Sequence, residues 1–271
     1  MDGSGHLLPC LGACPPIPMS SVQPSGSPLR LGDVVFEWHL SRSREGPRTF
    51  PQTFKGKLQT DGYGVYESLA RERGQELILV GCWPHARRGF HEALGVGRAA
   101  AWLVGQIGKL YAVEKHLREQ KAGPQRRAAV RAWQSRPILE RLRRAQAVVR
   151  RRVLPKSLLG QAIDYALARW EALIRYVDDG RLEVDNNLCE NAIQPTAVGK
   201  KNFLFVGHPE AGQRSAVIYS VLGSCRRHGI NPAEYLQAVF ERLPRATTSE
   251  LKSLTPGAWA KTKRAAQRPA A

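Results

Sequence analysis

The chain has few acidic side chains for its size: 23 Asp and Glu stand against 41 Lys and Arg among 271 residues, a formal net charge of +18. It also has no apolar run close to the roughly 18 residues that a membrane span requires. Its first residues show no basic start followed by an apolar stretch, the pattern of a signal peptide. We therefore expect a cytoplasmic protein with no membrane partner, and the charge indicates a polyanionic partner, most often nucleic acid.

Cysteine is scarce and scattered through the chain. The five cysteines are an odd number, at positions 10, 14, 82, 189 and 225, and do not resemble the disulfide framework of a small secreted domain. We infer a reducing compartment. The apolar fraction of 42% argues against wholesale disorder and is enough to bury a core.

Composition and periodicity divide the chain into five segments. Residues 1–31 are rich in Gly, Pro and Ser and predict a disordered tail. Strands predicted over 34–40, 57–60 and 76–81, with a helix over 66–73, indicate an α/β class for the next segment. The predicted domains are a tail over 1–31, the first part of a core over 32–95, a helical insertion over 96–180, the rest of the core over 181–243, and a mobile basic tail over 244–271.

Two carboxylates are candidates for metal chemistry. Asp61 follows a predicted strand and precedes Gly62, and the carboxyl ends of strands are where α/β folds place ligands and metals. Glu190 follows a polar Asp-Asn-Asn run near the start of a predicted helix. Each residue also has a simpler interpretation, because Asp often closes a tight turn and Glu complements a helix dipole.

Other polar groups offer weaker signals. Cys82 and His85 have C-x-x-H spacing, but no second pair at zinc-finger spacing accompanies them, so we favour a structural role. Lys200, Lys201 and Asn202 precede an aromatic residue in a predicted basic strand or loop over 200–206, a mixture that can contact phosphates and stack on bases. The arginines between 141 and 152 predict a phosphate-binding stripe on a helix, or only a solvated face.

Several motifs together resemble one family. They are Leu-Gln-Thr-Asp-Gly-Tyr over 58–63, Gly-Cys-Trp-Pro-His-Ala-Arg-Arg over 81–88, Asp-Asn-Asn over 185–187 with Glu190, Gly-Lys-Lys-Asn-Phe-Leu-Phe over 199–205 and Gly-Ile-Asn-Pro over 229–232. In this order and spacing, from about residue 34 to 243, the chain closely resembles the transposases of the insertion-sequence-66 family.

The resemblance implies a fold and a chemistry. The fold would be an RNase H-like core of the DDE type, interrupted by a helical insertion. Such a core uses Mg²⁺ or Mn²⁺ to nick element ends and join them to target DNA. Asp61 corresponds to the second acidic residue of the triad and Glu190 to the third, so both are implied catalytic and metal-binding residues. Arg87, Arg88 and the Lys200–Asn202 segment are the implied DNA contacts, and a homo-oligomer is left open.

One departure from the family pattern affects the expected activity. The family's first Asp lies on an earlier strand, whereas the only Asp residues before Asp61 here are Asp2 and Asp33, and neither has the matching context. We therefore predict an N-terminally truncated transposase that lacks the first strands of its core and has impaired activity. The alternative is a non-catalytic DNA-binding remnant. An RNA-binding module is less favoured, because no RNP motif is present.

Overall fold

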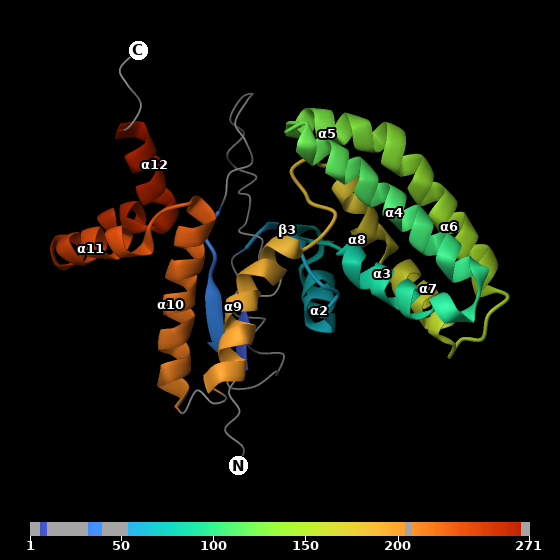
Figure 1. Cartoon of the computed structure of the whole chain (residues 1–271), viewed down its shortest axis with the longest axis horizontal. Helices are drawn as coiled ribbons and strands as arrows, with labels where there is room; N and C mark the ends of the chain where they lie inside the picture. The colour runs from blue at the N-terminus through green and yellow to red at the C-terminus, as the bar shows by residue number, and fades with distance from the viewer. Residues whose placement is uncertain (1–5, 10–31, 40–53, 204–207, 267–271) are drawn as a thin grey trace. The chain divides into compact units, whose positions relative to one another are not determined.

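The computed structural model describes residues 6–9, 32–39, 54–203 and 208–266, which fall into two compact units (Figure 1). One unit comprises residues 55–187, and the other comprises the described parts of residues 1–17, 30–54 and 188–271. Helices dominate both units, and each holds a two-stranded sheet. The architecture agrees with the predicted α/β class. The described strands do not include a full RNase H-like sheet, so that finer class stays a prediction.

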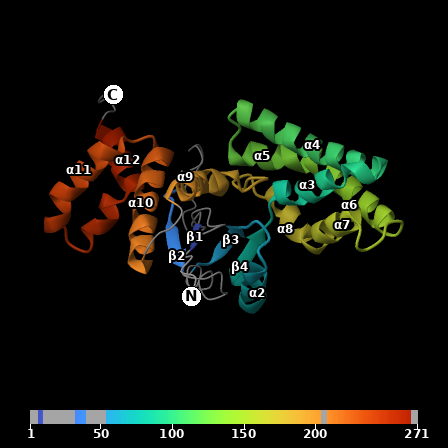
Figure 2. The same ribbon diagram turned by 60° about the horizontal axis from the view of Figure 1, so that its bottom comes forward.

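The unit of residues 55–187 begins with a parallel strand pair. Strand β3 (Gly56–Gln59) pairs with β4 (Leu77–Val80), with Gly56 opposite Leu77 and Gln59 opposite Val80. Helix α2 (Gly64–Arg73) and the short η1 (Gly74–Glu76) make the crossover that a parallel pair requires. Figure 2 shows the two strands side by side, with α2 against β4. The predicted strand, helix and strand are confirmed here.

A run of helices completes this unit. They are α3 (Trp83–Glu92), η2 (Leu94–Val96), α4 (Arg98–Glu119), α5 (Pro124–Val130), the π-helical η3 (Arg131–Ser135), α6 (Arg136–Arg150), α7 (Leu158–Ala168), α8 (Trp170–Ile174) and η4 (Arg175–Val177). Most of the apolar positions that predict these helices are buried, and Leu103 and Leu142 are fully so. They share one core with Val80 of β4 and Trp83 of α3. The predicted boundary between residues 95 and 96 therefore marks no gap in the packing.

The second unit has an antiparallel strand pair and a helical C-terminal half. Strand β1 (His6–Pro9) pairs with β2 (Phe36–His39). The helices are α9 (Asn187–Phe203), α10 (Pro209–His228), α11 (Pro232–Arg242), η5 (Leu243–Arg245), η6 (Glu250–Leu254) and α12 (Pro256–Ala266). The predicted helices over 213–227 and 232–242 are confirmed. Within the described ranges, no helix is both long enough and apolar enough to span a membrane.

Three local predictions are wrong. His6–Pro9 is a strand rather than part of a disordered tail, while residues 10–31 lie outside the described residues. Residues 200–203 continue α9 instead of forming a strand or loop, because adding residues to an existing helix is easy once it is nucleated. The segment from 244 to 266 is largely helical rather than a mobile tail.

The order of the C-terminal segment comes from contacts that its basic composition conceals. Asp33 accepts a hydrogen bond from the backbone N–H of Gly257 at 2.9 Å, in the first turn of α12. The hydroxyl of Tyr235 donates to the Leu254 carbonyl at 2.7 Å, and the Tyr235 ring meets Trp259 edge to face. A carboxylate at a helix N-terminus and an aromatic pair, of which Tyr235 is buried and Trp259 half-buried, stabilise α12 against the rest of its unit.

Candidate functional site

Asp61 lies in a tight turn directly after β3. The pairing with β4 continues for one more residue, because the Thr60 N–H donates to the Val80 carbonyl at 2.9 Å. One carboxylate oxygen of Asp61 then accepts a hydrogen bond from the Tyr63 N–H at 3.1 Å. Gly62 has a φ of +91°, and a Cβ there would lie 2.6 Å from the Tyr165 hydroxyl, so only glycine fits.

Two side chains from the end of α7 hold this turn. The Tyr165 hydroxyl donates to the Asp61 carbonyl at 3.0 Å, and an Arg169 N–H contacts the Gly62 carbonyl at 3.4 Å. Arg169 also pairs with Glu67 of α2 at 2.7 Å and lies over the Tyr165 ring, 4.2 Å from its centroid. Burial, the main cause, raises the pKa of Tyr165, so its hydroxyl stays protonated and can donate.

The arrangement at Asp61 suits a hard divalent cation. The second carboxylate oxygen of Asp61 makes no hydrogen bond within the described part of the chain. Mg²⁺ is usually bound by one or two carboxylates together with substrate phosphates and water. A half-buried carboxylate with its backbone fixed and one free oxygen has the chemistry of one such ligand.

Cys82 and His85 lie at the start of α3, directly after β4. Cys82 is the buried N-cap residue of this helix, and its sulfur accepts a 3.4 Å hydrogen bond from the Asn186 N–H. His85 lies in the first turn of the same helix. This contact attaches the start of α3 to the chain segment that follows η4, and a purely structural role of Cys82 and His85 stays a prediction.

That segment, residues 178–187, is called the strap. The Val184 carbonyl accepts from the Trp83 N–H at 3.1 Å, and the Glu183 carbonyl accepts from the Gln59 side chain at 2.9 Å. A Cβ on Gly180 would lie 1.8 Å from the Pro124 carbonyl oxygen, so the strap passes directly against the start of α5. The strap therefore lies against both the carboxyl ends of the parallel strands and the helices.

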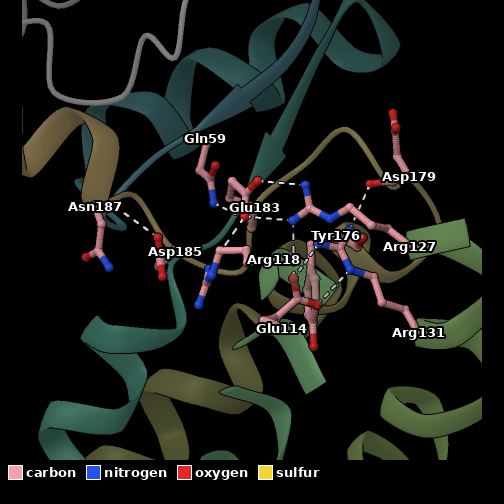
Figure 3. Close-up of polar contacts among 10 residues, drawn as sticks. All are labelled: Gln59, Glu114, Arg118, Arg127, Arg131, Tyr176, Asp179, Glu183, Asp185 and Asn187. Carbon is pink, nitrogen blue, oxygen red and sulfur yellow. Dashed lines mark hydrogen bonds and ion pairs between the residues drawn. The ribbon is translucent and has the colours of Figure 1, made fainter. Parts of the chain in front are cut away.

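A buried ionic cluster joins the strap to α4, α5 and η3 (Figure 3). Arg127 makes two hydrogen bonds to the carboxylate of Glu183, at 2.7 and 2.8 Å. Arg131 makes two to Glu114, both at 2.7 Å, and Arg127 also reaches Glu114 at 3.2 Å. Glu114 and Arg131 are 0% exposed. Buried charges are tolerated because each is paired and hydrogen-bonded in this way.

A second set of contacts fixes the beginning of the strap. Arg131 donates to the backbone carbonyls of Tyr176 and Asp179 at 2.7 and 3.2 Å. The Asp179 carboxylate pairs with Lys57 of β3 and with Arg181, each at 2.8 Å. Burial alone would raise the pKa of Asp179, but the hydrogen bonds from Arg181 and Lys57 outweigh it and hold that pKa well below its usual range.

The sequence matches two family models. The model described as "Transposase IS66 family" matches residues 26–214, and that of the "IS66 C-terminal element" matches residues 220–256. The chain belongs to the IS66 transposase family. No solved structure matches it.

The curated relatives of this transposase-family chain are longer proteins. The uncharacterized protein y4jD of Sinorhizobium fredii is 34% identical over 242 residues, which are 86% of this chain and 46% of the relative. The uncharacterized protein y4qI of the same organism is 35% identical over 211 residues, 75% of this chain and 39% of that protein. The chain thus spans less than half the length of these relatives.

The two acidic residues that the IS66 resemblance implies for catalysis belong to different units. Asp61 is in the unit of residues 55–187, whereas Glu190 is in the first turn of α9, in the other unit. Their meeting at one site stays a prediction. The helix position of Glu190 also agrees with the simpler interpretation, in which its carboxylate complements the helix dipole.

The implied DNA contacts of the IS66 chain are on helices. Arg87 and Arg88 are exposed on α3, and neither forms an ion pair with another described residue. The backbone of Lys200, Lys201 and Asn202 belongs to the last turns of α9. DNA binding by all five residues stays a prediction.

Sequence reasoning missed the residues that position Asp61 and the strap. Tyr165 and Arg169 are more than 100 residues from Asp61, and the apolar periodicity of their helix says nothing of the turn that they hold. The buried pair of Glu114 and Arg131 is likewise not among the residues identified from the sequence. The available signal was a charged residue at a position where the apolar stripe of a helix should continue.

Proposed function

We propose that the chain supplies part of the catalytic centre for DNA transposition, in which Mg²⁺ or Mn²⁺ supports cleavage of a DNA strand and its transfer to target DNA. The observation that carries the proposal is the Asp61 turn, which holds a carboxylate at the end of a parallel strand in a chain of the IS66 transposase family. Asp61 and Glu190 are its proposed metal ligands.

The bound cation would supply Lewis-acid stabilisation of the charge that develops on the phosphate oxygens during cleavage. The residues of this chain would hold the Asp61 carboxylate in place. Tyr165 and Gly62 fix the backbone of Asp61, and Lys57, Gln59 and the strap fix the strands on which the turn depends. Arg87 and Arg88 are proposed to bind DNA phosphates, since exposed arginines make bidentate contacts with phosphate.

We further propose that strand transfer by this chain alone is impaired. A centre of this type normally needs a third carboxylate, and Asp33 is engaged elsewhere. One of its oxygens lies 2.9 Å from both the His228 ring nitrogen and the Gly257 N–H. A site with two carboxylates binds the cation more weakly and positions it less well.

The first test measures Mn²⁺ binding to the full chain by electron paramagnetic resonance, in the presence of DNA carrying the element's ends. We expect Asp61→Asn and Glu190→Gln each to weaken binding by at least about tenfold, because the loss of even an outer-shell partner of a metal ligand costs this much. Asp178→Asn is the matched control, because Asp178 is an exposed carboxylate paired with Arg136. Binding unaffected by Asp61→Asn would overturn the proposal.

The second test is nicking of the same DNA with Mg²⁺ or Mn²⁺. We expect slow, metal-dependent nicking that Asp61→Asn and Glu190→Gln abolish and Asp178→Asn preserves. If the original chain nicks the DNA fast and both Asp61→Asn and Glu190→Gln abolish this nicking, only the proposed impairment is contradicted. Nicking that persists in both would contradict the assignment of the two residues.

The alternative function is DNA binding without catalysis, favoured by the excess of exposed arginine over acid. It predicts that the chain retards duplex DNA, with an affinity that falls steeply as salt rises because counterions are released. It also predicts no metal binding that depends on Asp61. Absence of retardation at low salt would exclude it.

A further inference from the structure

Helix α6 and the residues just after it present arginines to solvent. Arg141, Arg143, Arg144, Arg151 and Arg152 are all exposed, and the set is called the arginine face. Within the described ranges none of the five has an acidic partner. By contrast, two other arginines of the same helix are paired, Arg136 with Asp178 and Arg150 with Asp164. The arginine face is therefore a surface of uncompensated positive charge.

An apolar groove lies beside this charge, between α4 and α6. It has a volume of about 400 Å³ and is lined by Ala99, Trp102, Arg144, Ala145, Val148 and Val149. Trp102 is 45% exposed and Val148 is 52% exposed. The two helices lie side by side in Figures 1 and 2. An indole and a guanidinium thus share one shallow groove.

The spacing of residues along α6 places part of the arginine face and part of the groove on the same side of the helix. Arg141, Arg144, Val148 and Arg151 are separated by three, four and three positions, which places them along one face of the helix. A second aromatic residue, Trp133 in η3, precedes α6 and is 77% exposed. An indole and a guanidinium in one groove suit a ligand with both an anionic part and a flat apolar part.

We propose that this surface is a second nucleic-acid site that binds single-stranded DNA, with phosphates on the arginine face and an unpaired base against Trp102 in the groove. Stacking on aromatic side chains beside a basic track is how proteins hold single strands. The bases of a duplex are already stacked and paired, so a duplex would use the arginines and leave the groove empty. A peptide made only of acidic residues, such as polyglutamate, would likewise have no flat apolar part to place on Trp102.

This inference rests on the proposed function only for the choice of DNA as ligand. It concerns binding, so it can be tested in buffer with EDTA, where no cleavage occurs. The probes are a fluorescent oligothymidine and a hairpin duplex of the same number of phosphates, with fluorescence anisotropy as the readout. Loss of nicking would then contradict the catalytic proposal without affecting this one.

The decisive variant is Trp102→Ala. We expect the affinity for oligothymidine to fall by about tenfold, as for the loss of one stacked base, and the affinity for the hairpin to stay within about twofold. Trp102→Phe retains an aromatic face and should restore most of the single-strand affinity. Thermal unfolding of each variant checks the fold. We expect the fold to persist, because Trp102 is an exposed residue. Equal effects on both probes, or none, would overturn the proposal.

The arginine face is tested by the triple variant Arg141→Gln, Arg144→Gln, Arg151→Gln. We expect weaker binding of both probes, with the slope of log affinity against log salt for the single strand reduced by about two. The matched control removes the same charge from exposed positions of the other unit, Arg245→Gln, Lys252→Gln, Lys261→Gln. Two outcomes would overturn the proposal, because each would show only a general attraction between opposite charges. One is an equal loss of affinity in the control variant, and the other is displacement of oligothymidine by polyglutamate as effectively as by DNA.

Discussion

Arg127 of α5 and Arg131 of η3 lie in one continuous stretch of sequence with the arginine face, but the two sets have opposite environments. Arg127 and Arg131 are buried and bonded to Glu114 and Glu183, whereas the arginine face ten or more residues later is exposed and has no acidic partner in the described part of the chain. The same side chain thus acts as an internal structural element in one place and as an unpaired surface charge in the other. The difference shows that partners from other elements decide what an arginine does.

The largest expected loss of stability comes from a change in the buried set of arginines and their acidic partners. Glu114→Gln removes the carboxylate that neutralises Arg131 and leaves a charged guanidinium in the core. We expect the free energy of unfolding to fall by about 3–5 kcal/mol, as for other broken buried ion pairs. Denaturant titration followed by circular dichroism measures it.

The control for this prediction is Glu140→Gln, a change of the same chemistry at an exposed position of α6. It should alter the free energy of unfolding by no more than about 0.5 kcal/mol. If the two variants lose similar amounts, burial is not what distinguishes the two sets of arginines.

An intermediate effect concerns the pH dependence of the contact between Lys57 and Asp179. The pKa of Asp179 is lower in the folded chain than in the unfolded chain, so its contribution is present above the unfolded pKa and is lost as the pH falls through the folded one. Lys57→Gln should cost on the order of 1 kcal/mol at neutral pH. The difference in the free energy of unfolding between this variant and the original chain should become smaller at acidic pH.

The measurement is denaturant unfolding of both chains at a series of pH values from about 7 down to about 3, a range that reaches below the usual pKa of Asp. A difference that stays constant over the whole series would show that Lys57 acts through packing rather than through the charge of Asp179.

The smallest effect on stability is expected for changes in the exposed arginine face. Arg144→Gln or Arg151→Gln should change the free energy of unfolding by less than about 0.5 kcal/mol, because neither side chain has an ion-pair partner to lose among the described residues. The midpoint of thermal unfolding reports it. A marked loss of stability would mean that the arginine face has a structural role.

The sequence predicted the elements whose signals are local. Alternating and continuous apolar runs identified β2, β3 and β4, and three- and four-residue spacing identified the long helices. The turn at Asp61 was also predictable, since Asp-Gly after a strand is a local signal. These patterns depend only on neighbours along the chain, so no knowledge of the packing is needed to detect them.

The contacts that make these elements a site were not predictable from one sequence. Nothing in the helical pattern of α7 indicates that Tyr165 bonds to the Asp61 carbonyl. Likewise, α12 has the composition of a solvated tail, and its order depends on Asp33, more than 200 residues earlier. Such pairings are set by tertiary packing, which local propensity does not encode.

The hydrogen bond between Tyr165 and Asp61 has a consequence for the order of folding. It closes a loop of about 100 residues, and such long-range contacts form late because the entropy of closure must be overcome first. The helical hairpins of α4 to α7 are local and can form early. We therefore expect the Asp61 turn to reach its final conformation only after those helices have docked, which makes the helices a prerequisite for the turn rather than an addition to a finished strand pair.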